Sequence, residues 1–350
     1  MRQRISLAAY TFSHFCVDFA CFYMLFSGFR NFLSAGGAAL QTVAVGFLLY
    51  NILAFGLQPF IGYACDARKG IPVAATGCAL LLTGLALISL PWVSLVLCAL
   101  GNACFHVGGG IDSLVHANGR MARSGIFVSS GAIGVSLGMM AGQSESVPLY
   151  VPMLLIAVCG IALLVIDKRT GRERSIIRFN ITGALLPFSA MLALCLFSIV
   201  IRAYIGASVP IPWKTTALLM LLPSIGACSG KAAGGYLADK FGAKSTGVVT
   251  LLLSIPFLCL GYGHPVFCTV GIFLFNITMP VTLCAVASGF PHNPGLSFGL
   301  TTLGLLCGSV PTFFFAIPAN VVPIVAALCI AASAACLFVS IINTKKEIAL

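Results

Sequence analysis

The chain is dominated by continuous apolar runs of about twenty residues, separated by short polar breaks. A run of this length crosses the hydrocarbon core of a bilayer as one α-helix, in which every backbone polar group is bonded internally. The runs do not alternate between apolar and polar residues, which argues against a transmembrane β-barrel. With 59% hydrophobic and 8% charged residues, the chain also has too few polar side chains to cover a water-soluble domain. We therefore predict a polytopic membrane protein.

The apolar runs predict twelve transmembrane helices with short loops, which leave no room for an extramembrane domain. They fall at 5–28, 40–65, 71–89, 92–115, 122–144, 147–166, 182–208, 213–238, 244–262, 265–290, 295–317 and 320–342. The segment 167–180, with five basic residues, divides them into six-helix halves at 1–166 and 181–350. The predicted fold class is an all-α polytopic membrane protein.

Lys and Arg residues indicate which side of the membrane each loop faces. Of the 19, all lie in the termini or in alternate loops except Arg30 and Lys214, in the opposite loops, and Arg202 and Lys231, inside predicted spans. Because cytoplasmic loops are enriched in these residues, we predict an inner (plasma) membrane protein with both termini cytoplasmic. We interpret Lys231 as a side chain that extends toward the cytoplasmic surface. The net charge of +11 then reflects topology, and no nucleic-acid partner is predicted.

The sequence has no catalytic or cofactor-binding motif. The fifteen Cys show no zinc-ligand spacing and mostly lie inside apolar runs, where we interpret them as packing residues. There is no His-Glu-x-x-His segment, no phosphate-binding loop and no plausible Ser/His/Asp set. We predict that the chain is not an enzyme and has no cofactor and no resident metal.

Two loops at equivalent positions in the two halves are similar to each other. The residues concerned are Gly62, Asp66 and Arg68 in the first loop, and Gly235, Asp239, Lys240, Gly242 and Lys244 in the second. The glycines permit close helix contact, and each aspartate can accept hydrogen bonds from the N terminus of a neighbouring helix. We predict that these residues form a conformational gate. A duplication on this scale, with binding between the halves, is typical of a secondary transporter.

The second loop, 235–244, resembles the signature loop of the major facilitator superfamily. Four stretches resemble its fosmidomycin-resistance-type transporters: Ser13 to Asp18, Leu57 to Pro59, Phe105-His106, and Phe290 to Gly295. The chain differs from that subfamily at Val17, where the pattern has Asn, and at Val107-Gly108, where it has Pro-Glu. The resemblance implies two halves that rock about a cavity lined by the first, fourth, seventh and tenth spans. It also implies proton-driven export of a small amphipathic or anionic toxicant, and thus an efflux antiporter for drug resistance.

Polar side chains inside the predicted spans fall on the four that this resemblance places around the cavity. They are His14, Asp18, His106, Arg202, Tyr204 and Asn276. Such groups are costly in a bilayer and mark transport pathways. Asp18 shares a helix face with His14 and lies about 18 Å from the cytoplasmic helix end, near the midplane, where burial disfavours its charged form.

From this placement we predict that Asp18 carries the coupling proton and that His14 or His106 tunes or relays it. Arg202 is predicted to bind an anionic group of the substrate or to pair with Asp18. Tyr204 and Asn276 are weaker candidates. The predicted partners are a small-molecule substrate, protons and the lipid bilayer, with the monomer as the functional unit.

Other interpretations stay open. Transport could be uptake by proton symport, or movement of a divalent metal through His14, Asp18 and His106, whose side chains are competent ligands. The same charges could form a static network, and the chain could be a non-transporting scaffold or sensor. Away from the cavity, Asp112 is predicted to be an interfacial charge or a partner of Arg120 or Arg123. The glycine-rich stretch 131–142 is predicted to be a helix-packing face.

Overall fold

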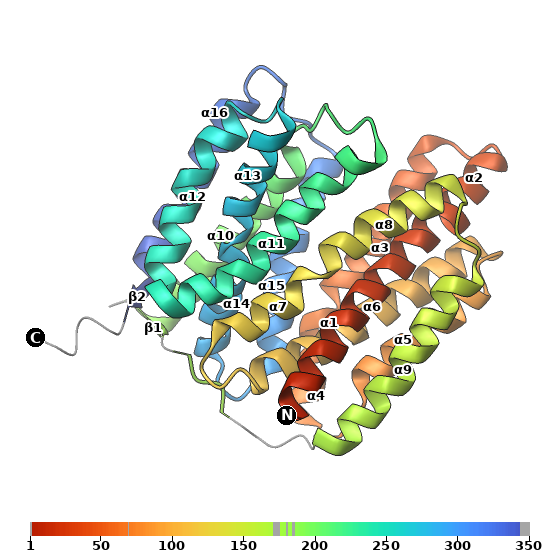
Figure 1. Cartoon of the computed structure of the whole chain (residues 1–350), viewed down its shortest axis with the longest axis horizontal. Helices are drawn as coiled ribbons and strands as arrows, with labels where there is room; N and C mark the ends of the chain where they lie inside the picture. The colour runs from red at the N-terminus through yellow and green to blue at the C-terminus, as the bar shows by residue number, and fades with distance from the viewer. Residues whose placement is uncertain (1, 69, 171–175, 180, 184–185, 344–350) are drawn as a thin grey trace, which may run out of the picture.

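The computed structural model describes residues 2–68, 70–170, 176–179, 181–183 and 186–343. Within these residues the chain forms long helices that pack side by side (Figure 1). The first group is α1 (Arg2–Met24), which continues through a π-helical turn (Leu25–Asn31) into α2 (Phe32–Ala35), then α3 (Leu40–Gly56), α4 (Gln58–Ala67), α5 (Val73–Ala86), α6 (Pro91–Val115), α7 (Met121–Ser129), α8 (Gly131–Ser144) and α9 (Tyr150–Thr170). The second is α10 (Phe188–Ser208), α11 (Ala217–Phe241), α12 (Ala243–Cys259), α13 (Pro265–Asn276), α14 (Thr278–Gly289), α15 (Pro294–Ser309), a 3₁₀ turn (Val310–Phe313) and α16 (Val322–Ser340).

Ten helical stretches of the described chain are long and apolar enough to cross a bilayer. The pairs α3–α4, α7–α8 and α13–α14 each form one such stretch, because their boundaries are single-residue irregularities in a continuous helix. Two further apolar helices, α5 with 14 residues and α12 with 17, are shorter. The prediction of an all-α polytopic membrane protein is confirmed at this level.

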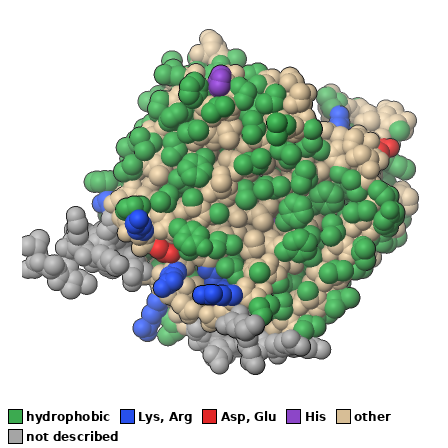
Figure 2. Space-filling view, in the orientation of Figure 1, with side chains coloured by type: hydrophobic (Ala, Val, Ile, Leu, Met, Phe, Trp, Pro, Cys, Tyr) green, Lys and Arg blue, Asp and Glu red, His purple; other side chains and the backbone are tan. Residues whose placement is uncertain are grey.

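The two ends of the molecule differ in charge. Figure 2 shows hydrophobic side chains over most of one face, and Lys and Arg gathered toward the end where the N terminus lies in Figure 1. We call this end the basic end. There α1 begins, α4 and α11 end, and α7, α12 and α15 begin, so the two gate loops also lie there.

Helices α1–α9 and α10–α16 lie on opposite sides of the molecule in Figure 1. Across the boundary between these groups, α7 packs against α11, and α4 packs against α15. Within the first group, α8 packs against α1 through small residues, as the glycine pattern predicts. A Cβ on Gly134 or Gly138 would strike the carbonyl oxygens of Phe15 and Phe19, so glycine is needed for this approach.

Two details differ from the sequence prediction. Helix α9 extends to Thr170, beyond the expected end of its span at 166, and a short antiparallel pair joins β1 (Ile181–Gly183) to β2 (Ile341–Asn343). Strands of three residues are too short to show alternation in a sequence, so no pattern could have predicted them. Of the predicted linker 167–180, residues 171–175 and 180 lie outside the described residues.

Candidate functional site

A buried cluster of two histidines and one carboxylate joins α1 to α6. His14 and Asp18 lie one turn apart on α1, with His14 Nε2 at 3.3 Å from Asp18 Oδ2. His106 on α6 places its Nε2 at 2.9 Å from His14 Nε2 and 3.6 Å from Asp18 Oδ1. The three residues are 5–8% exposed. The structure thus brings these three side chains together in one buried cluster.

Backbone carbonyls fix the orientation of both imidazole rings. The Nδ1–H of His14 donates to Phe127 O at 2.7 Å, and the Nδ1–H of His106 donates to Asn102 O at 3.0 Å. Because a carbonyl oxygen can only accept, each ring carries a proton on Nδ1. The two Nε2 atoms that face each other can therefore form a hydrogen bond only if one additional proton lies between them. Such a proton would give the pair one positive charge beside the Asp18 carboxylate.

Two residues that the sequence reasoning missed complete the cluster. Asn102 Nδ2 donates to Asp18 Oδ1 at 3.3 Å, while its own Oδ1 is buried without a partner. Gly131, at the start of α8, has Asp18 and His14 directly beside its Cα, and any side chain there would strike both. Asn102 could have been found from its position one turn before His106 on the same helix face. Gly131 could not have been identified from its position, because its predicted span contains several glycines.

The cluster opens on a cavity of about 280 Å³ that lies between the two groups of helices. We call it the histidine cavity. Besides the cluster, its lining includes Phe22, Tyr50, Val128, Val135, Leu283 and Lys231. An acid–base cluster in a largely apolar cavity is typical of a binding site for a small molecule.

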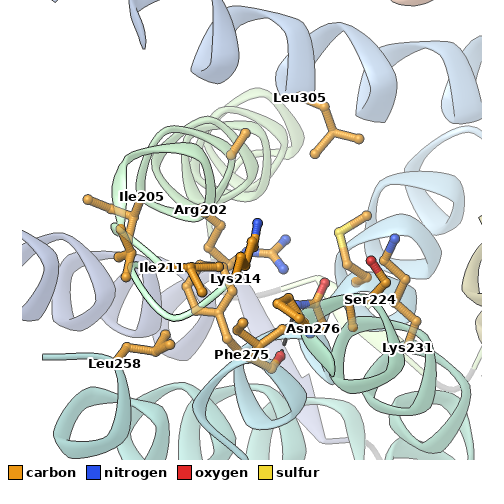
Figure 3. A pocket seen from close by; sticks show the side chains of 17 residues that line it. Arg202, Ile205, Ile211, Lys214, Ser224, Lys231, Leu258, Phe275, Asn276 and Leu305 are labelled. Atoms are coloured by element: carbon orange, nitrogen blue, oxygen red, sulfur yellow. Dashed lines mark hydrogen bonds between the residues drawn. The ribbon is translucent and has the colours of Figure 1, made fainter. Parts of the chain in front are cut away.

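A second cavity, of about 400 Å³, adjoins the first and is lined mainly by α10, α11, α13 and the loop after α10, with single residues from α12, α14 and α15 (Figure 3). The two cavities share Lys231, Met279 and Leu305 in their linings. Arg202, Lys214 and Lys231 are the charged residues among the described residues that line the second cavity, which we call the cationic cavity. It extends past the end of α10 to Val209, Ile211 and Lys214, and so toward the end opposite the basic end.

Arg202 is 4% exposed and lies within the C-terminal group. Its two Nη groups donate to the hydroxyls of Thr278 and Thr282, and its Nε is buried without a partner. The alternative in which Arg202 pairs with Asp18 is therefore wrong, because threonine hydroxyls on α14 take its hydrogen bonds. Asn276 lines the cationic cavity, whereas Tyr204 is absent from the described linings of both cavities.

The interpretation of Lys231 as a side chain that extends toward the cytoplasmic surface is wrong. Its side chain lines both cavities, and Figure 3 shows it among the labelled residues around the cationic cavity. The reason lies in the packing of its helix. The Lys231 carbonyl faces Gly125 on α7 at a distance that leaves no room for a Cβ there, which places this stretch of α11 at the boundary between the two groups.

The two gate aspartates each bind the N terminus of a helix in the other group. Asp66 accepts hydrogen bonds from the backbone N–H groups of Gly295 and Leu296, both at 2.9 Å. Asp239 accepts them from Met121 and Ala122, at 2.8 and 3.1 Å. A carboxylate is favoured at a helix N terminus, where backbone N–H groups lack partners within the helix.

The gate glycines let the backbones meet where these bonds form. A Cβ on Gly295 would lie 2.5 Å from Gly62 O, and one on Gly235 would lie 2.5 Å from Ala122 Cα. Gly242 has a φ of +89° and ends α11, a conformation that favours glycine. Lys240 and Lys244 lie over the rings of Phe241 and Phe338, and Arg68 follows the end of α4.

Asp112 belongs to a separate buried network near the basic end. Its carboxylate pairs with Arg123 at 2.6 Å and also accepts from Ser6 and His116. Arg123 in turn donates to Gln3 O at 2.6 Å. Of the two bases considered for Asp112, the partner is thus Arg123. The network ties α1 and α6 to α7 and contributes to the packing of this group.

The fold is similar to that of known transporters. The chain matches the fucose:proton symporter FucP of E. coli with a TM-score of 0.67 and 14% identity, covering 96% of this chain and 98% of that one. A second structure of FucP, a major facilitator superfamily transporter in the outward conformation, matches with a TM-score of 0.60 over 94% and 98% of the two chains. The human organic anion transporter MFSD10 matches with a TM-score of 0.65 and 13% identity, over 96% and 97%.

These proteins are transporters and not enzymes. No protein-family model matches the sequence, and no curated protein matches it. At such low identity the similarity establishes the fold and leaves the substrate open. The chain has the fold of the major facilitator superfamily transporters.

Proposed function

We propose that the chain is a secondary active transporter that couples the movement of a small amphipathic or anionic compound to protons by alternating access. One observation carries the proposal: a buried cluster, in which the Nε2 atoms of His14 and His106 lie 2.9 Å apart beside Asp18, opens on a cavity between the two groups of helices, next to a cavity with three cations. Ionisable groups at such a depth in a membrane protein mark transport pathways. Known transporters with the same fold support this function.

The proposed architecture has twelve spans in two six-helix halves, 1–166 and 181–350, joined by a cytoplasmic linker at 167–180. At 1.5 Å per residue α5 and α12 are about 21 and 26 Å long, less than the ~30 Å hydrocarbon core. Polar residues near helix ends and local thinning of the bilayer accommodate a short helix at modest cost. The basic end faces the cytoplasm in this proposal, which puts both termini there, in the inner (plasma) membrane.

In this orientation the two gate aspartates hold the cytoplasmic end closed, while the cationic cavity extends toward the outer end. Release of both aspartates would let the halves rock and open the site to the cytoplasm. Gly62, Asp66, Gly235 and Asp239 are then the central gate residues. A single chain supplies both halves, so we propose that the monomer is functional.

The proposed chemistry divides the site between the halves. Asp18, His14 and His106 of the N-terminal half bind and release the coupling proton. Arg202 of the C-terminal half, together with Asn276, faces the substrate. Tyr204 stays a prediction without support from the cavity linings. The resemblance to fosmidomycin-resistance-type transporters favours export by antiport, and uptake by proton symport is the alternative.

A second candidate function is supported by one distance. One ligand atom from each of His14, Asp18 and His106 lies within 4.8 Å of the others, close enough to hold one divalent metal ion as cargo. Metal dependence of transport separates this candidate from the first. A scaffold or sensor role would require no movement of any compound.

The test uses everted membrane vesicles energised to an acidic interior, with a pH-sensitive dye. Organic acids, phosphonates, hydrophobic cations and metal ions are added in turn. We expect one class to move protons with the native protein and not with Asp18→Asn. Glu145→Gln is the matched control, because it removes an exposed carboxylate outside both cavities. If no class moves protons while the protein is folded and present, proton coupling is refuted.

A further inference from the structure

The position of Lys231 gives the cationic cavity a direct electrostatic link to the proton cluster. Lys231 lies in the linings of both cavities, one of which is also lined by Asp18 and the other by Arg202. It comes from α11, whereas Asp18 comes from α1. A change in the charge of the cluster around Asp18 therefore changes the electrostatic energy of Lys231.

The cationic cavity lacks a negative charge of its own. Among the described residues that line it, three are cations and none is a carboxylate. The 4% exposed guanidinium of Arg202 is bonded only to neutral hydroxyls, with its Nε unpartnered. Buried charges without a counter-charge are costly, so a ligand with a negative group gains energy by entering this cavity. Its chemistry fits an organic anion.

The remaining walls indicate what the rest of the ligand is like. The histidine cavity, which meets the cationic cavity at Lys231, Met279 and Leu305, is lined by Phe22, Val128 and Leu283 among others. Cavities of about 280 and 400 Å³ are in the size range that holds drug-sized ligands. A compound with one anionic head and an apolar body would place the head near Arg202 and Lys231 and the body against these walls.

The balance of charges around Lys231 determines whether binding of the proton favours or opposes binding of the anion. Without the shared proton, two neutral histidines and the Asp18 carboxylate carry one negative charge, which balances Lys231. With the proton, the cluster is neutral and Lys231 is left for an anion. Asn102 on α6, the Tyr50 hydroxyl on α3 and the Cys21 thiol on α1 also lie near Asp18, and these neutral groups do not change this count.

From these contacts we infer that Arg202 and Lys231 form the binding site for an organic anion, and that the anion binds together with the coupling proton. Two ligands that favour each other's binding are carried through the same conformational change in the same direction. The transporter is then a proton–anion symporter. This inference rests on the proposed function and chooses, among its alternatives, symport over antiport.

The experiment measures anion binding to the purified full-length protein in nanodiscs, without a proton gradient. Benzoate, hexanoate and benzenesulfonate are the probes, with benzamide as the uncharged control, and their affinities are determined by calorimetry between pH 5.5 and 8. If one proton binds with each anion, the affinity falls as the pH rises, by up to about tenfold per pH unit. Benzamide should show no such dependence.

Variants of Lys231 connect this result to the residue. We expect Lys231→Gln to weaken anion binding at least tenfold and to reduce its pH dependence, and Lys231→Arg to restore both. Arg30→Gln, which removes a cation outside both cavities, should bind anions as the native protein does. Circular dichroism and size-exclusion chromatography verify that each variant is folded.

Three results would overturn the inference: no anion binding at any pH, an affinity that rises with pH, or binding that Lys231→Gln leaves unchanged. The vesicle assay of the proposed function gives an independent result. If protons move there in an Asp18-dependent manner while anion affinity rises with pH, the proposal of proton-coupled transport is supported and the inference of symport is wrong. If anion binding follows the expected pH dependence but no compound moves protons, the proposed function fails.

Discussion

Removal of one gate carboxylate should open the basic end and should also increase hydrogen exchange at the amides that the other gate aspartate binds. The change is Asp66→Asn, which keeps the size of the side chain but removes its charge and one of its two acceptor oxygens. Asp66 accepts two hydrogen bonds, from Gly295 and Leu296 at 2.9 Å each, so the asparagine can keep one at most. The reciprocal variant is Asp239→Asn, whose native carboxylate accepts at 2.8 and 3.1 Å.

The size of the effect follows from these bonds. A hydrogen bond to a charged group contributes about 1.5–3 kcal/mol, and the partial exposure of both carboxylates reduces this to about 1–2 kcal/mol. If that energy holds the basic end closed, its loss raises the open population by about 5- to 30-fold. Amide hydrogen exchange is proportional to that population when reclosing is fast, so it measures the change directly.

The assay is hydrogen–deuterium exchange followed by mass spectrometry of the purified protein. In Asp66→Asn, faster exchange at Gly295 and Leu296 is expected merely because their acceptor is gone. The informative signal lies at Met121 and Ala122, which bind the unaltered Asp239. If the halves rock as rigid bodies, exchange there also rises by about 5- to 30-fold. Unchanged exchange at Met121 and Ala122 would refute concerted opening and would reduce the effect of Asp66 to local fraying of α15.

Three further substitutions test the packing around the site. Gly131→Ala would push Asp18 and His14 apart, so we expect at least a tenfold loss of proton-coupled transport in vesicles with little change in melting temperature. Gly138→Val should lower the melting temperature by several degrees because its side chain meets the Phe19 carbonyl, whereas Gly263→Ala, with nothing within 4 Å, should not. Asp112→Asn leaves Arg123 without its charged partner, and the loss of about 3–5 kcal/mol should appear as poor thermal stability; a native melting curve would show that the pair contributes little.

The sequence was sufficient to predict an all-α polytopic membrane protein and some local contacts. Apolar runs of bilayer length predicted the helices, and the two aspartate loops predicted bonds to helix N termini that are present at Gly295 and Met121. The spacing of His14 and Asp18 placed them on one face of α1. These features are local or repeated, so a pattern can reveal them.

What could not be predicted depends on the tertiary arrangement. The carbonyls of Phe127 and Asn102 fix the imidazole rings, but a backbone oxygen leaves no trace in a residue pattern. The direction of Lys231 depends on how α11 is rotated against α7, and a helix with small residues on several faces gives no periodicity from which to read that rotation. Gly131 is one glycine among many, and its role appears only once Asp18 lies beside it.

Helix α11 connects the gate to the proton cluster by its length alone. It carries Lys231 in the cavities and Asp239 at the basic end, eight residues further on, about 12 Å along one continuous helix. His14, Asp18 and His106 belong to the other group of helices, as do the Met121 and Ala122 amides that Asp239 binds. In the proposed mechanism, a rigid movement of the C-terminal group of helices that takes Asp239 from these amides would also change the distance from Lys231 to Asp18. Because protonation of the cluster would alter the attraction between those two charges, it would also alter the energy needed to separate Asp239 from the amides. The proposed coupling thus has a structural route that needs no flexible intermediate.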